Sequence, residues 1–275
     1  MSVRHSIADR GALDPVRIAR LLAEAGWTGP EPVVLATTGS TNAQAAELAA
    51  AGAPEGACVV ADVQTAGRGR LGRTWESPPH AGLWMSVVVR AADQPATRLG
   101  WLPLAVGLAT VDAIRALGPV PISLKWPNDL MARTAGCGGS GELRKLGGIL
   151  AERQPDGSVV VGIGLNVALG ADELPVPTAT SLALEAGPTD REALLVQILV
   201  HLLDRVAQWR GGDPALARDY RQACASIGRL VDVQLPGDRM VHGTVTGIDQ
   251  DGHLLVDTDG ISLTITAGDV IHATI

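Results

Sequence analysis

The sequence predicts an α+β fold in which a larger domain of strands and helices is followed by a small β-barrel. In the first 227 residues, short apolar runs typical of buried strands alternate with apolar residues at helical spacing. From Gly228 onward, turn sequences recur about every ten residues, which is typical of a small antiparallel barrel. We therefore expect two domains, residues 1–227 and residues 228–275.

The composition favours a globular cytoplasmic protein. Of the 275 residues, 46% are hydrophobic and 19% are charged, which is enough apolar material for a core. The N-terminus shows no apolar signal segment, and the longest apolar run, Trp101–Val111, is too short to span a bilayer. Three widely separated cysteines predict packing roles rather than disulfides or a metal site. A net charge of −7 argues against a nucleic-acid partner, so phosphate chemistry must rely on local charge.

The elements of the first domain alternate along the chain. Glycine and proline mark most of their ends. In chain order, we expect a helix at 14–25, strands at 33–37, 56–63 and 83–89, a helix at 98–117, strands at 121–126, 145–152 and 158–167, a loop at 172–188 and a helix at 190–209.

Polar residues at the start of one helix and at the end of one strand could either stabilise the local structure or bind a ligand. Thr41 and Gln44 fit a capping box at the start of an alanine-rich helix, and the same helix start could offer N–H groups to a ligand. Pro127 stops the strand before it, so that Asn128 and Asp129 project from the strand end.

The segment from Gln64 to Trp75 is the strongest candidate for an anion site. It holds three arginines, Arg68, Arg70 and Arg73, and three glycines between two apolar strands. Glycine lets backbone N–H groups approach a ligand, and arginine clamps phosphate or carboxylate oxygens in pairs. A mobile, solvated basic loop is the alternative interpretation.

Lysines and small residues add to this pattern. The chain has only two lysines, Lys125 and Lys145, and both lie in motif-like segments. An arginine-biased genome would explain their scarcity, but not their positions. Gly162 and Gly164 fall on one strand face, where a flat ligand, another backbone or a packed helix could approach closely.

Five segments in this order resemble biotin protein ligases, and the resemblance covers most of the chain. It implies a mixed central sheet with flanking helices, like that of class II aminoacyl-tRNA synthetases, and an SH3-like C-terminal barrel. Only about forty residues precede Ser40, so we expect a monofunctional ligase without a winged helix-turn-helix or repressor function. The five segments are 39–42, 64–75, 125–129, 145–150 and 162–166.

The resemblance implies a reaction in two steps. Biotin and ATP with Mg²⁺ give biotinyl-5′-AMP, which then acylates one lysine of a biotin carboxyl carrier domain of an acyl-CoA carboxylase. Cations in a closing loop would offset the repulsion between the carboxylate and the triphosphate. The resemblance also implies carrier docking near a sheet edge, and either a monomer or a homodimer.

The resemblance assigns the site residues in three groups. Lys145, Arg68 and Asp129 are expected to be catalytic. Biotin is expected at Ser40, Thr41, Asn42, Gln64, Arg68, Gly69, Arg70 and Lys145, and ATP or the adenylate at Arg70, Arg73, Trp75, Asn128, Lys145 and Asn166.

Several questions stay open at this point. Asp129 could orient Lys145, assist the incoming amine or contribute to Mg²⁺ binding, whereas Asn128 and Asp129 could instead only cap a turn. Residues 65–73 are expected to be disordered without ligand and ordered by the adenylate. The glycine-rich stretch 135–144 is longer than the corresponding connection in the family, which could alter carrier docking.

Three other functions compete with this interpretation. A lipoate or octanoate transferase of the same fold is not expected to carry the arginine loop followed by tryptophan. A non-catalytic sensor of biotinyl-adenylate is disfavoured by the retained lysines. An RNA-binding domain is disfavoured by the acidic charge balance, one tyrosine and the lack of phenylalanine.

Overall fold

A seven-stranded mixed sheet forms the larger domain of the computed structural model, which describes residues 10–76, 78–134, 141–237 and 239–272. Its strand order is β1-β2-β3-β7-β6-β5-β4. The first two strands are parallel and the other neighbouring pairs are antiparallel, which confirms the predicted mixed sheet. The strands are β1 (Val33–Thr38), β2 (Cys58–Gln64), β3 (Gly82–Val89), β4 (Ile122–Lys125), β5 (Asp129–Arg133), β6 (Leu143–Arg153) and β7 (Val159–Asn166).

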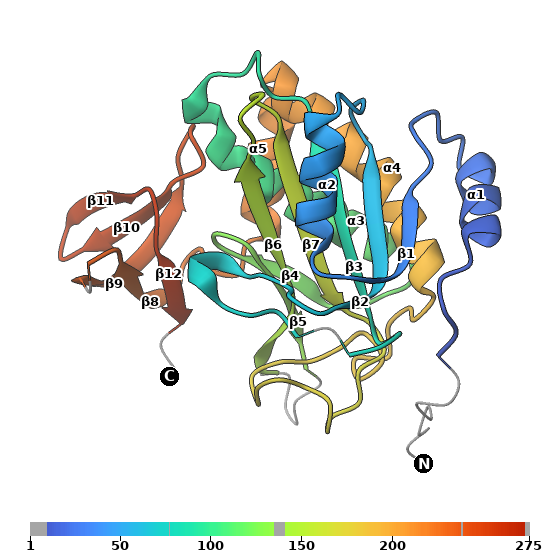
Figure 1. The fold of residues 1–275 in the computed structure, drawn as a ribbon. Coiled ribbons are helices and arrows are strands. Elements are labelled where there is room, and N and C mark those ends of the chain that lie inside the picture. The colour runs from blue at the N-terminus through green and yellow to red at the C-terminus, as the bar shows by residue number, and fades with distance from the viewer. Residues whose placement is uncertain (1–9, 77, 135–140, 238, 273–275) are drawn as a thin grey trace.

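Helices cover both faces of this sheet (Figure 1). One face packs against α2 (Thr41–Ala50) through small residues such as Ala45 and Ala49. The other face packs against α3 (Trp101–Leu117), which is buried along most of its length and lies against α4 (Arg191–Gly211). The remaining helices are α1 (Pro15–Glu24) and α5 (Pro214–Ala223).

Two findings on the helices differ from the sequence analysis. The helix α5 was not predicted, although Asp213 as N-cap followed by Pro214 is a usual start signal. The helical stretch Ala96–Leu117 is long and apolar enough to cross a membrane by length and composition, contrary to the expectation from the shorter apolar run. Two thirds of its apolar window, 67%, is buried inside the structure, as is usual for a core helix.

The predicted capping box at the start of α2 is wrong. Ser40 is the N-cap, and its side chain makes no capping hydrogen bond. The backbone N–H of Thr41 instead donates to Gln64 Oε1 at 2.8 Å, while Gln44 contacts Glu47. A partner from β2 therefore satisfies the helix start, because tertiary contact brings an acceptor that the local sequence does not reveal.

The C-terminal domain is a five-stranded antiparallel sheet with the order β11-β10-β9-β8-β12. It docks on the larger domain through the turn after β9: Trp101 Nε1 donates to Gln250 O at 2.8 Å, and Trp126 Nε1 donates to Gly252 O at 3.0 Å. This contact helps to place β12 beside the larger sheet. The strands are β8 (Leu230–Leu235), β9 (Arg239–Ile248), β10 (Leu254–Thr258), β11 (Ile261–Ile265) and β12 (Asp269–His272).

Candidate active site

One row of register partners runs across five strands of the larger sheet. Lys125 pairs with Asp129, Asp129 with Gly148, Gly148 with Gly164, and Gly164 with Trp84. Residues directly opposite one another in an antiparallel pair project to the same face of a sheet. The sheet thus places a lysine and a carboxylate at one end of the row and a tryptophan at the other, with two glycines between them.

A bulge in β6 brings Lys145 to this face. Leu130 pairs with Gly147 and Met131 with Lys145, so one residue of β6 has no partner on β5. Strand residues three apart would otherwise face opposite sides, and the extra residue removes that offset between Lys145 and Gly148. A Cβ added at Gly148 would lie 3.6 Å from Lys145 Cε, which confirms that the two share a face.

Asp129 holds both lysines of the chain. Lys145 Nζ lies 2.6 Å from Asp129 Oδ1, and Lys125 Nζ lies 3.4 Å from Asp129 Oδ2. Asn128, in contrast, contacts β6 and the arginine loop: its Nδ2 donates to Ile149 O at 2.8 Å, and its Oδ1 accepts from Arg70 Nη1 at 3.2 Å. Of the roles left open for Asp129, this geometry favours the orientation of Lys145.

The glycines of β6 and β7 make room for side chains of the protein itself. A Cβ at Gly164 would lie 2.6 Å from Trp75 Cε2, and a Cβ at Gly162 would lie 2.2 Å from Asn42 Oδ1. The indole of Trp75 also contacts Trp84 edge-on, with ring centroids 6.2 Å apart. The close approach that small residues predict is therefore made by Trp75 and Asn42.

A buried polar cluster lies at the start of α2. Ser86 Oγ lies 2.8 Å from Thr41 Oγ1 and 2.6 Å from Asn42 Oδ1, and Asn42 Nδ2 donates to Glu152 Oε2 at 2.6 Å. Ser86 and Glu152 were not among the predicted site residues. A single serine inside the apolar strand β3 was the available signal for the first, because buried hydroxyls need a partner.

The arginine loop is a small hairpin. Gly69 N donates to Arg73 O at 2.7 Å, and Trp75 N donates to Gly67 O at 2.9 Å. A Cβ at position 67 would lie 2.5 Å from Trp75 O, so the closure of this hairpin requires glycine there.

The loop arginines contact carboxylates far away in the sequence. Arg70 Nη1 lies 3.3 Å from Asp269 Oδ1, Arg73 pairs with the other oxygen of Asp269, and Arg68 Nη2 lies 3.3 Å from Glu152 Oε2. Asp269 comes from β12 of the C-terminal domain, and the sequence analysis missed it. The loop therefore bridges the two domains (Figure 1).

The segment after β7 forms another wall of the site. Lys145 N donates to Thr178 O and Thr180 N donates to Lys145 O, both at 2.8 Å. Asn166 Nδ2 donates to Thr180 O at 3.0 Å. This segment, predicted only as a loop, therefore holds Thr178 and Thr180 against the predicted site residues Lys145 and Asn166.

These features enclose one cavity of about 490 Å³, a size that suits a small-molecule ligand. Of the glycine-rich stretch 135–144, residues 135–140 lie outside the described residues. Every predicted site residue lines the cavity, although their individual roles stay predictions: Ser40, Thr41, Asn42, Gln64, Arg68, Gly69, Arg70, Arg73, Trp75, Asn128, Asp129, Lys145 and Asn166.

Fold and site together define a protein with a small-molecule cavity lined by several lysines and arginines, and comparisons with known proteins identify the family. Residues 34–168 match the biotin/lipoate A/B protein ligase family, and residues 226–273 match the biotin protein ligase C-terminal domain. The chain belongs to the biotin protein ligases of this family, as the sequence analysis predicted.

Individual relatives support this assignment over most of the chain. It is 43% identical to the biotin--[acetyl-CoA-carboxylase] ligase of Mycobacterium tuberculosis, over 97% of this chain and 99% of that protein. It is 36% identical to the bifunctional ligase/repressor BirA of Escherichia coli, over 75% of this chain and 63% of that protein. The biotin protein ligase of Aquifex aeolicus in complex with biotin and ATP superposes with a TM-score of 0.72, at 26% identity, over 88% of this chain and 98% of that one.

Proposed function

We propose that this protein activates biotin with ATP as biotinyl-5′-AMP and transfers the biotinyl group to one lysine of a biotin carboxyl carrier domain. The observation that carries the proposal is the placement of Lys145 and Lys125 on Asp129, in the same cavity as three loop arginines. The names of the relatives support the substrates, since one is an acetyl-CoA-carboxylase ligase and another was solved with biotin and ATP.

In the first step, a carboxylate oxygen of biotin attacks the α-phosphorus of ATP, and the bond to pyrophosphate breaks. Both reactants are anions, so positive charge must be fixed near the point where they meet. The Lys145 ammonium is compact and can follow charge as it moves from the carboxylate to the phosphoryl oxygens. The cavity places this ammonium 5.8 Å from the centroid of Trp75, which we assign to the adenine wall.

Magnesium would enter this site with the triphosphate. Asp129 and Asp269 line the cavity, but both are held by lysine or arginine. In the described part of the chain, a group of three potential metal ligands occurs instead at Asp249, Asp251 and His253, outside the cavity. When it binds with ATP, Mg²⁺ would supply positive charge to the triphosphate, and few carboxylates of this cavity would be free to hold it.

In the second step, the amine of the carrier lysine attacks the acyl carbon, and AMP leaves. This amine must lose a proton first, because free lysine has a pKa of about 10.4. Asp129 is already engaged by two ammonium groups, so we assign it to the orientation of Lys145 rather than to removal of that proton.

The test is biotin-dependent exchange of labelled pyrophosphate into ATP, followed by mass spectrometry of a carrier domain. We expect exchange with biotin, and a carrier that gains one biotinyl group when Mg²⁺, ATP and biotin are present. Lipoate in place of biotin should support neither reaction. Absence of exchange with biotin would contradict the proposed function, and equal rates with lipoate would contradict the assigned substrate.

A further inference from the structure

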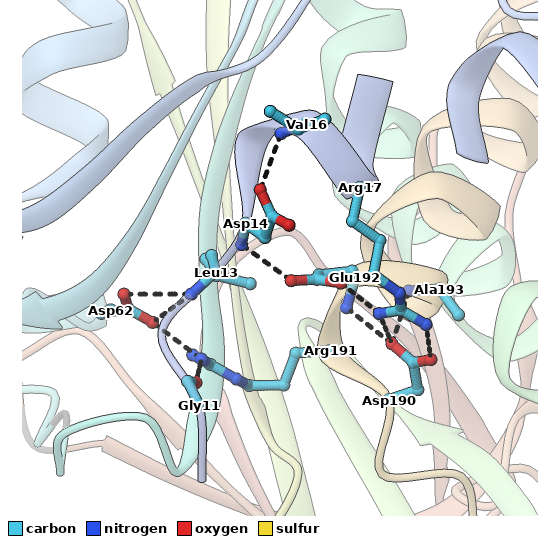
Figure 2. A network of polar contacts seen from close by, with 10 residues as sticks. All are labelled: Gly11, Leu13, Asp14, Val16, Arg17, Asp62, Asp190, Arg191, Glu192 and Ala193. Atoms are coloured by element: carbon cyan, nitrogen blue, oxygen red, sulfur yellow. Dashed lines mark hydrogen bonds and ion pairs between the residues drawn. The ribbon is translucent and has the colours of Figure 1, made fainter. Parts of the chain in front are cut away.

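The segment before α1 is held firmly on the end of the sheet farthest from the C-terminal domain. Leu13 N donates to Asp62 Oδ2 at 3.2 Å, Asp14 N donates to Glu192 Oε1 at 2.7 Å, and Arg191 Nη2 donates to Gly11 O at 2.6 Å. Figure 2 shows these contacts in two neighbouring groups, one around Asp62 and Arg191 and one around Glu192. We call residues 10–14 the N-terminal strap. Because β2 and α4 hold the backbone of the strap by hydrogen bonds, the position of Arg10 at its start is fixed.

That side chain, Arg10, reaches the wall segment after β7. Its two terminal nitrogens contact the two carboxylate oxygens of Glu173 at 3.0 and 2.7 Å, and one of them also donates to Ala168 O. The side chains of Arg10 and Glu173 are only 10% and 19% exposed. Glu173 also accepts from Gly170 N at 2.8 Å, and hydrogen bonding to Arg10 lowers the pKa of its carboxyl below the usual range. The forked, partly buried pair fixes the turn at 170–173.

This turn leads directly into the cavity. Leu174, the next residue, packs in the apolar cluster that contains Trp75 and Trp84. Pro175 and Val176 then line the cavity, shortly before the backbone pairs with Lys145. A shift of Glu173 would therefore be transmitted to the indole of Trp75 and to the wall beside Lys145 within a few residues.

We propose that Arg10 is a positioning residue for adenylate formation: through Glu173 it sets the wall that packs behind Trp75 and beside Lys145. The inference rests on the proposed function, because it assigns this wall to the nucleotide side of the cavity. The polar cluster around Ser86, on the biotin side, is not touched by Arg10. Loss of the pair should thus affect ATP and the adenylate more than biotin.

The test compares Arg10→Gln, Glu173→Gln and the double variant by pyrophosphate exchange and by release of labelled adenylate from the purified complex. In both single variants, we expect KM for ATP to rise about tenfold and release of the adenylate to accelerate, while KM for biotin stays within about twofold of the wild type. Because Arg10 and Glu173 contact each other, the effects of the two substitutions should not add. The double variant should be no worse than either single variant, and Arg10→Lys should be intermediate because it keeps the charge without the fork.

Arg17→Gln is the matched control. Arg17 lies in α1, directly after the strap, and pairs with Asp190 and Glu192, but it does not contact the wall segment. Its KM for ATP should stay unchanged even if its melting temperature falls.

If Arg10→Gln and Glu173→Gln lowered only the melting temperature, with wild-type KM for ATP and adenylate release, the proposal would be overturned. If the wild type itself showed no exchange, the proposed function would fail instead. Should Arg10→Gln not fold, Glu173→Gln decides, because it leaves the backbone contacts of the strap in place.

Discussion

Replacing Gly164 with alanine tests whether the sheet is cleared to receive Trp75. The added Cβ would lie 2.6 to 2.9 Å from three atoms of the indole, closer than real Cβ contacts occur. To avoid this contact, the rigid ring would have to move off the sheet into the cavity that it lines and would lose its edge-on contact with Trp84. Overpacking of this kind costs about 1–3 kcal/mol. The melting temperature of the ligand-free protein should fall by roughly 2–4 °C for each kcal/mol.

The decisive measurement is the same substitution in a Trp75→Ala background. Once the indole is removed, the new methyl group has free space, so Gly164→Ala should cost little beyond the loss already caused by Trp75→Ala. Gly211→Ala is the control, because an added Cβ at the end of α4 meets nothing within 4 Å. That change should be neutral or slightly stabilising. An equal cost of Gly164→Ala with and without Trp75 would refute the reasoning, since the strain would then lie in the backbone.

Three further predictions concern the reaction and the pH response. Lys145→Gln should lower pyrophosphate exchange by about 10²–10³ while biotin affinity changes far less, and unchanged pyrophosphate release would remove Lys145 from the mechanism. Protease should cut residues 65–73 more slowly with biotin and ATP than without them, and equal rates would contradict ligand-dependent ordering. Burial, with Lys125 and Arg229 nearby, lowers the pKa of His272 to about 4. Unfolding therefore takes up a proton between pH 6.5 and 4, so stability should fall as the pH drops through this window, less so in His272→Gln, as urea titrations would measure.

What the sequence revealed about the site was local. The arginine loop, the segment around each lysine and the paired glycines are short stretches of sequence. The chemistry of their residue types restricts the functions that these stretches can have. Asp269 and Glu152 could not be found in this way, because they become site residues only when distant strands meet the loop. The local pattern at Thr41 was misleading for the same reason. Thr41 begins α2, and the acceptor for its N–H is Gln64 from the strand β2.

The fold shows the same division between local and distant information. Strand and helix patterns predicted most elements, whereas α5 was missed because it has only ten residues and few large apolar side chains. The bulge that turns Lys145 toward Asp129 is a property of the β5–β6 pairing and not of β6 alone. The sequence could therefore name the reactive lysine, but only the paired strands explain how it reaches its carboxylate.

The charges in the cavity suggest how two anions are admitted. Five lysines and arginines line the cavity together with three carboxylates, those of Glu76, Asp129 and Asp269, so the lining sums to a formal charge of +2 before any substrate binds (5 − 3). The cations pair with Asp129, Asp269 and Glu152, the last of which lies outside the lining. Phosphate and biotin oxygens can thus replace the carboxylates as partners instead of binding to bare cations. The carboxylates keep each cation oriented before substrates bind and limit the repulsion among the cations. Arg70 and Arg73 pair with Asp269 of the C-terminal domain, so we expect ligand binding at these two arginines to be coupled to the contact between the domains. The cations are Arg68, Arg70, Arg73, Lys125 and Lys145.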